Sequence, residues 1–150
     1  MDKQKLQEEL KKSMLAKDEV RTSTLRLLLS AINYFEIQKG GAGYIATQED
    51  VMSAIANQAK QRRDSIAEFQ KAGRQELVDK EQKELDILQT FLPEQMSEEE
   101  IAREVDAAIT QSGASSIQDM GKVMVALSKL KGKADMGAVS ELVRGRLNKD

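Results

Sequence analysis

The stretch LPEQMSEEE, residues 92–100, divides this sequence of 150 residues into two parts. Pro93 is the only proline in the chain, and its ring disfavours a helical conformation for Leu92. Ser97 and Glu100 have the spacing of a capping box, in which each side chain accepts the other residue's backbone N–H at the start of a helix. The stretch therefore predicts two domains, an N-terminal helical domain at 1–92 and a C-terminal one at 97–150.

Upstream of this boundary, apolar residues recur every three or four positions, which is the spacing of one helix face. These runs predict four helices, which cover residues 6–14, 25–35, 47–73 and 77–92. The glycine-rich KGGAG, residues 39–43, separates the second helix from the third and is expected to act as a hinge. Arg62, in the basic cluster KQRRDS (60–65), falls on the apolar face of the third helix, so we expect it to pair with Glu81 or Glu84. Contact with nucleic acid is the alternative for this cluster.

Downstream of the boundary, the same spacing predicts three more helices, separated by SGASS (112–116) and KGKAD (131–135). Gly113 suits the left-handed end of a helix, and Ser115 or Ser116 suits the start of the next. No long segment alternates apolar and polar residues as a strand would. We therefore predict an all-α fold, an N-terminal helical hairpin or bundle unit followed by a small C-terminal three-helix bundle.

The composition excludes several classes of function. The chain has no His and no Cys, so the commonest general base, the commonest transition-metal ligands and any disulfide are absent. We expect no catalytic residue, no metal and no cofactor. No apolar run approaches the roughly 18 residues of a membrane span, and MDKQKLQEEL at the N-terminus lacks the apolar core of a signal peptide. These features lead us to expect a cytoplasmic protein without a membrane partner.

The charge is unevenly distributed in the C-terminal part. Residues 97–120 carry six acidic side chains against one basic, whereas residues 121–150 carry seven basic against three acidic. The segment KLKGKAD, residues 129–135, places three of the lysines at alternate positions, where ammonium groups could meet phosphates. The helix after it would add free N–H groups near residues 134–137. A solvated loop with Asp135 as N-cap is the alternative, and the residues alone leave both interpretations open.

Several segments together resemble the GatB/YqeY family. They are STLRLLLSAIN (23–33), KQRRDSIAEFQKAGRQEL (60–77), ELDILQTFLPEQMSEEEI (84–101) and DMGKVMVALSKLKGKADMGAVSELVRGRL (119–147). The family includes small stand-alone YqeY-like proteins, whose length this chain matches. Its tail domain also forms the C-terminal end of the GatB subunit in the aspartyl/glutamyl-tRNA amidotransferase, where it holds the elbow of the tRNA.

The resemblance implies tRNA as a partner and GKVM (121–124) and the KLKGKAD loop as its contacts. The expected nucleic-acid-binding residues are Lys122, Lys129, Lys131, Gly132, Lys133, Arg144 and Arg146. The family is often assigned glutamine-dependent carbon–nitrogen ligase activity, but this sequence has no counterpart of that enzyme's catalytic centres. Two hypotheses follow, a non-catalytic tRNA-binding module and a protein–protein adaptor that uses a groove between the two helical halves. Oligomeric state and protein partners stay open.

Overall fold

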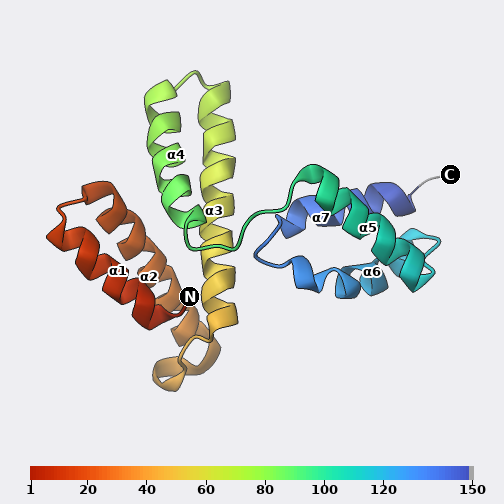
Figure 1. Ribbon diagram of the computed structural model, residues 1–150, viewed down its shortest axis with the longest axis horizontal. Coiled ribbons are helices and arrows are strands. Elements are labelled where there is room, and N and C mark those ends of the chain that lie inside the picture. Colours follow the sequence, from red (N-terminus) through yellow and green to blue (C-terminus); the bar gives the residue numbers. More distant parts are fainter. Residues whose placement is uncertain (149–150) are drawn as a thin grey trace. The chain divides into compact units, whose positions relative to one another are not determined.

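A computed structural model describes residues 1–148, and over these residues it contains seven α-helices and no β-strand (Figure 1). The α-helices are α1 (Lys3–Leu15), α2 (Glu19–Gly40), α3 (Gln48–Lys71), α4 (Gln75–Gln89), α5 (Glu98–Ser112), α6 (Met120–Ala126) and α7 (Met136–Leu147). Three short 3-10 helices, η1 (Gly41–Gly43), η2 (Ile117–Asp119) and η3 (Ser128–Leu130), lie in the connections. The predicted all-α fold is confirmed.

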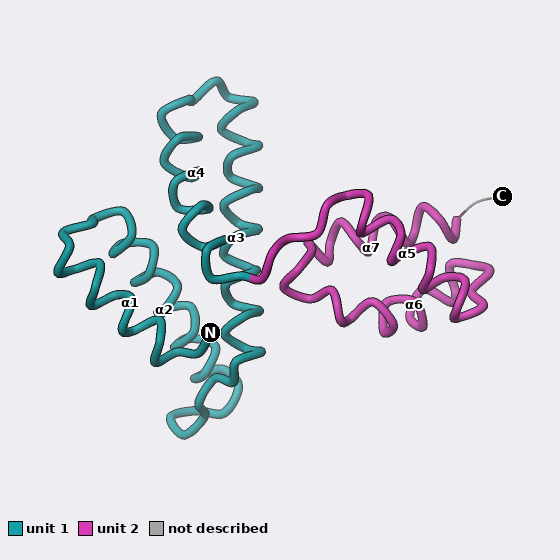
Figure 2. The backbone as a smooth tube through the Cα atoms, viewed as in Figure 1, with its two compact units in different colours: residues 1–92 teal, residues 93–150 magenta. Residues whose placement is uncertain are grey.

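The chain forms two compact units, Met1–Leu92 with α1 to α4 and a second unit from Pro93 onward with α5 to α7 (Figure 2). Each unit has an apolar core of its own. The core of the first unit is built from Leu6, Leu25, Leu28, Leu29, Ile32, Val51, Ile55, Ala59, Leu85 and Leu88. That of the second is built from Val105, Ala108, Val123, Leu127, Leu130, Ala134, Val139, Val143 and Leu147.

Local chemistry explains where the helices begin and end. The capping boxes of Thr47 with Asp50 and of Ser97 with Glu100 are both formed, at the starts of α3 and α5. The predicted fourth helix is too long, because α4 ends at Gln89 and the N–H groups of residues 90–92 turn back to carbonyls three residues earlier. These hydrogen bonds give partners to the last helical carbonyls, so the helix can end before the proline. Within the described residues, no helix combines the length and apolarity of a membrane crossing.

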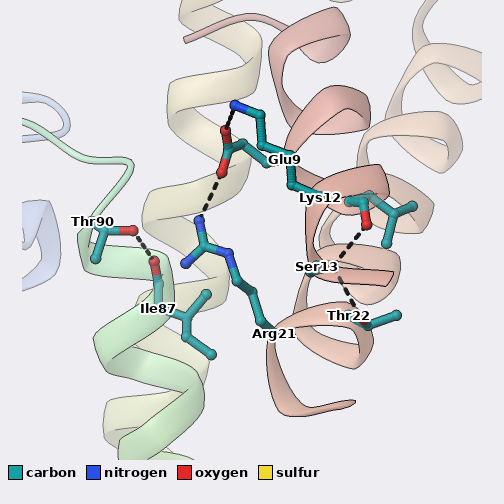
Figure 3. A network of polar contacts seen from close by, with 8 residues as sticks. Glu9, Lys12, Ser13, Arg21, Thr22, Ile87 and Thr90 are labelled. Atoms are coloured by element: carbon teal, nitrogen blue, oxygen red, sulfur yellow. Dashed lines mark hydrogen bonds and ion pairs between the residues drawn. The ribbon is translucent and has the colours of Figure 1, made fainter. Parts of the chain in front are cut away.

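Polar contacts join the helices of the first unit. Glu9 of α1 accepts from Lys12 at 2.8 Å and from Arg21 of α2 at 2.9 Å, and these hydrogen bonds lower the pKa of its carboxyl group (Figure 3). The hydroxyl groups of Ser13 and Thr22 are 2.9 Å apart in the same interface. These contacts are more specific in geometry than apolar packing. They set how α1 lies against α2.

The basic cluster KQRRDS contributes to the packing of α3 on α4. Arg62 Nη1 donates to Glu84 Oε2 at 2.7 Å and to Glu81 Oε2 at 3.2 Å. Glu84 is nearly buried, with 7% of its side chain exposed. The predicted pairing of Arg62 is therefore confirmed, and it involves both acids.

Candidate nucleic-acid interface

The connection between α6 and α7 alternates buried and exposed residues. Leu130, Gly132 and Ala134 are buried, whereas Lys129, Lys131 and Lys133 between them are exposed. Leu130 and Ala134 pack into the core of the second unit. Gly132 has φ +83°, a conformation that a residue with a Cβ rarely adopts. The apolar positions thus anchor the backbone inward, and the three ammonium groups face outward from it.

The segment just after the proline holds this lysine loop, which we define as residues 129–133. The Gln95 side chain donates from Nε2 to the Gly132 carbonyl at 2.9 Å, and the Met96 N–H donates to the Lys133 carbonyl at 2.9 Å. The Lys133 N–H donates in turn to Leu130 O at 2.9 Å. Residues 95 and 96 were not predicted to take part in the site. No pattern in the sequence could indicate them, because they lie about 37 positions from their partners.

An acid from α5 neutralises one of the three lysines. Lys129 Nζ lies 3.0 Å from Glu104 Oε2, and both side chains are partly exposed. Among the described residues, Lys131 and Lys133 make no ion pair within 4.0 Å. The three predicted lysines therefore differ in availability. Lys131 and Lys133 can meet an external anion, whereas Lys129 is already paired.

An open hollow of about 670 Å³ adjoins the lysine loop. Its charged lining is mixed, with Glu94, Glu100, Arg103, Glu104, Lys129 and Lys133 around it. Glu100 is committed to the capping box of α5, and hydrogen bonds from the N–H and hydroxyl of Ser97 lower the pKa of its carboxyl group. Acids and bases of equal number make the hollow a poor site for a small anion, so the exposed rim of the loop is the better candidate surface.

The remaining predicted residues lie on α6 and α7, the helices on either side of the lysine loop. Arg144 and Arg146 lie in the last turn of α7, about 12 Å and about 15 Å along the helix from its start at a rise of 1.5 Å per residue. Arg146 Nε lies 3.1 Å from Asp106 Oδ1 of α5, whereas Arg144 is exposed. Lys122 lies in α6, where its charge helps lower the pKa of Asp119 after the larger effect of the Ser115 and Ser116 N–H groups.

Part of the expected phosphate site is already occupied within the protein. Gly137 N–H donates to Asp135 Oδ1 at 2.9 Å and Ala134 N–H donates to Leu130 O at 3.0 Å, so neither of these two groups is free for a phosphate. The Asp135 carboxylate also places negative charge where an anion would bind. The GKVM segment lies within α6, and only its lysine adds to the positive surface.

The serine-rich segment SGASS serves helix termini. Gly113 ends α5 with φ +68°, as predicted. The N–H groups of Ser115 and Ser116 donate to Asp119 Oδ2 at 3.0 and 3.3 Å, a contact that shapes the turn into η2. Among the described residues, no group of three or more acidic side chains is placed to hold a metal ion.

Comparisons with known proteins agree with this architecture. A family model described as "Yqey-like protein" matches residues 3–147. Similar proteins occur in Kluyveromyces lactis (44% identical, over 71% of this chain and 55% of the relative) and in Lachancea thermotolerans (38%, over 71% and 57%). A relative in Saccharomyces cerevisiae strain S288c is 34% identical over 75% of this chain and 63% of its own. The chain thus spans little more than half the length of these curated relatives.

The relatives correct one expectation. All three carry the name "Altered inheritance of mitochondria protein 41, mitochondrial". The predicted cytoplasmic location is therefore wrong as an inference from composition. The absence of Cys excludes disulfides, but a chain without disulfides is compatible with any compartment.

Proposed function

The chain belongs to the Yqey-like protein family, and on that premise we propose that its second unit is a non-catalytic module that binds the sugar–phosphate backbone of folded tRNA. The ligand class comes from the resemblance of residues 119–147 to the tail domain of the tRNA-dependent amidotransferase. The carbon–nitrogen ligase chemistry assigned to the family is the larger enzyme's, and the proposal gives this chain none of it.

The observation that carries the proposal is the lysine loop. Lys131 and Lys133 are exposed on a backbone held by Gln95 and Met96. A held loop loses little conformational entropy when a phosphate binds, and unpaired ammonium groups lose no internal partner. Arg144, also exposed, can contact the same ligand at a second phosphate farther along α7.

The chemistry favours a folded RNA recognised through its backbone. Lysine binds phosphate as a point charge, and contacts to the phosphate backbone position the ligand without reading its bases. Aromatic residues make up only 3% of the chain, too few for a platform on which single-stranded bases could stack. Binding is therefore expected to be salt-dependent and insensitive to sequence.

The test is a titration of an unmodified tRNA transcript at several salt concentrations, with a single-stranded RNA of equal length beside it. The double variant Lys131→Ala, Lys133→Ala should weaken tRNA binding and flatten the slope of log K against log salt by about 1.5 to 2 units. The matched control is Lys80→Ala, Lys83→Ala, which removes two exposed lysines from α4 of the first unit.

A second variant tests the role of the ion pair. Glu104→Gln releases Lys129 from its acid and should tighten tRNA binding about two- to fivefold with a steeper salt slope. Equal effects of the two double variants, or an unchanged slope in the first, would refute RNA binding by the lysine loop. The adaptor hypothesis, with the loop as a solvated turn, would then be the better account.

A further inference from the structure

Helix α2 carries a second apolar stripe on the side opposite its core face. Val20, Leu27, Tyr34 and Ile37 are exposed by 39%, 49%, 66% and 64%, although large apolar residues are usually covered. At 100° per residue, their mean direction lies about 180° from that of the buried Leu25, Leu28, Leu29 and Ile32. Exposed apolar residues gathered along one helix face mark an interaction surface.

The stripe has the spacing of a coiled-coil seam. Val20, Leu27 and Tyr34 are seven residues apart, and Ser23, Ser30 and Ile37 follow each of them by three. This is the a and d pattern by which one helix packs along another. We propose that the stripe is the interface of a homodimer in which α2 packs antiparallel against α2 of a second copy. This inference goes beyond the proposed RNA binding and does not depend on it.

The sizes of the side chains support an antiparallel register. When residue 27 lies opposite residue 30 of the second copy, Tyr34 lies opposite Ser23, and Val20 lies opposite Ile37. Each of these facing pairs forms one layer of the interface. Two of the three layers pair a large side chain with a serine, which lets the facing surfaces interdigitate. A parallel pair would instead place serine on serine and tyrosine on tyrosine, with voids in some layers and crowding in others.

Charge at the ends of α2 supports the same register. Asp18 caps the start of the helix and Lys39 lies in its last turn, so an antiparallel pair brings each Asp18 opposite Lys39 of the second copy. Lys39 already lies 3.6 Å from Asp50, but half of its side chain stays exposed. The two helix dipoles also oppose each other, which is favourable.

The size of the stripe sets the expected strength. From Val20 to Ile37 it is about 26 Å long at 1.5 Å per residue, and it is one helix wide. A single helix pair of this length falls below the standard interface of about 1,600 Å². The dimer should therefore be reversible, with a Kd on the order of 10 µM.

Sedimentation equilibrium of the full chain from about 1 µM to about 300 µM tests the proposal, since this range brackets such a Kd. The mass should rise from monomer to dimer. Leu27→Glu places two carboxylates beside the two-fold axis and should keep the protein monomeric. At about 1 µM, where the original chain is also mostly monomeric, its melting temperature should be unchanged, because Leu27 does not contribute to the core. The matched control Val125→Glu makes the same kind of change on α6, where Val125 is 75% exposed, and should dimerise normally.

Single cysteines test the register in a chain that has none of its own. In the proposed dimer the two copies of residue 30 are offset by about 4.5 Å along the helix and the two copies of residue 23 by about 17 Å. Ser30→Cys should therefore crosslink under mild oxidation and Ser23→Cys should not. A monomer at every concentration, a dimer that survives Leu27→Glu, or equal crosslinking of both cysteines would each overturn the proposal.

Discussion

The two basic clusters of this protein have opposite surroundings. In the first unit, Arg62 of KQRRDS is paired with Glu84 and Glu81 between α3 and α4. In the second, Lys131 and Lys133 of KLKGKAD are exposed on a held loop. The interiors differ in the same way, because the buried polar or charged side chains among the described residues all lie in the first unit. They are Ser13, Thr22, Thr24, Glu36 and Glu84.

This difference teaches that a cluster of cations does not by itself indicate a binding surface. The acids that reach it across the fold decide its role. A cation whose partner is buried contributes to stability, and its loss leaves a charge without a counterion. A cation on an exposed, anchored loop contributes almost nothing to stability and is available to a ligand. The comparison can be tested by substitutions whose expected effects on stability decrease in order.

The largest effect is expected at Arg62. Arg62→Ala leaves Glu84 nearly buried without its cation and should lower the free energy of unfolding of the first unit by about 2–4 kcal/mol in urea denaturation. The control Lys60→Ala, at an exposed position of the same cluster, should cost less than about 0.5 kcal/mol. Replacing Glu81 and Glu84 with Leu alongside Arg62→Met should recover most of the loss. Equal losses at residues 60 and 62 would contradict the contrast between the clusters.

The next effect belongs to Gly132. Gly132→Ala places a Cβ on a residue with φ +83° and should destabilise the second unit by about 1–2 kcal/mol. The matched control is Gly145→Ala in α7, where an added Cβ meets nothing within 4 Å, and it should stabilise by about 0.5–1 kcal/mol. Thermal unfolding of both variants checks the pair. Similar shifts of the same sign would mean that the lysine loop is not held as described.

A smaller effect is expected on acidification. The Tyr44 hydroxyl, 2.5 Å away, and the Thr47 N–H lower the pKa of Asp50 to about 2 from its ordinary 3.8. Because the folded-state pKa is the lower one, the carboxylate stabilises the first unit above about pH 4 and this contribution is lost as the pH falls towards 2. Melting temperatures from pH 6 to pH 2 should fall less steeply for Asp50→Asn than for the original chain. Glu49→Gln, an exposed neighbour, should leave the pH profile unchanged.

A still smaller effect is expected at the lysine loop. Lys131→Ala with Lys133→Ala should change the free energy of unfolding by less than about 0.5 kcal/mol, because neither ammonium group has a described partner to lose. The same variant should lose tRNA affinity, as argued above. A large decrease in the free energy of unfolding, measured in urea, would mean that these lysines contribute to stability as Arg62 does.

No effect on catalysis is expected from the serines of SGASS. Supplied with glutamine, ATP and Glu-tRNA, the purified chain should form no amide and release no ammonia, because it lacks the groups that activate a nucleophile. Ser115→Ala and Ser116→Ala should leave that background unchanged. Activity that persists through purification and disappears in either variant would show that the chain is itself an enzyme.

Much of the fold was predictable because its signals are local. Capping boxes at Thr47 and Ser97 join residues three positions apart, and Gly113 ends its helix through its own backbone conformation. The candidate site was predictable only as a set of cations. Lys129 pairs with Glu104, 25 positions away, and Gln95 donates to the carbonyl of Gly132, 37 positions away. A single sequence carries no signal for contacts at such separations. The apolar stripe of α2 did have a signal, the seven-residue spacing of Val20, Leu27 and Tyr34.

The sequence by itself determined that this protein is helical, where most of its helices begin, and which family it belongs to. These properties follow from propensity, capping and periodicity, which act within a few residues. Only the tertiary structure decided which lysine of the lysine loop is paired, which N–H groups near the start of α7 are occupied, and which face of α2 stays uncovered. The physical reason is that electrostatic pairing and burial depend on distance in space, and helix packing brings together charges that lie far apart along the chain.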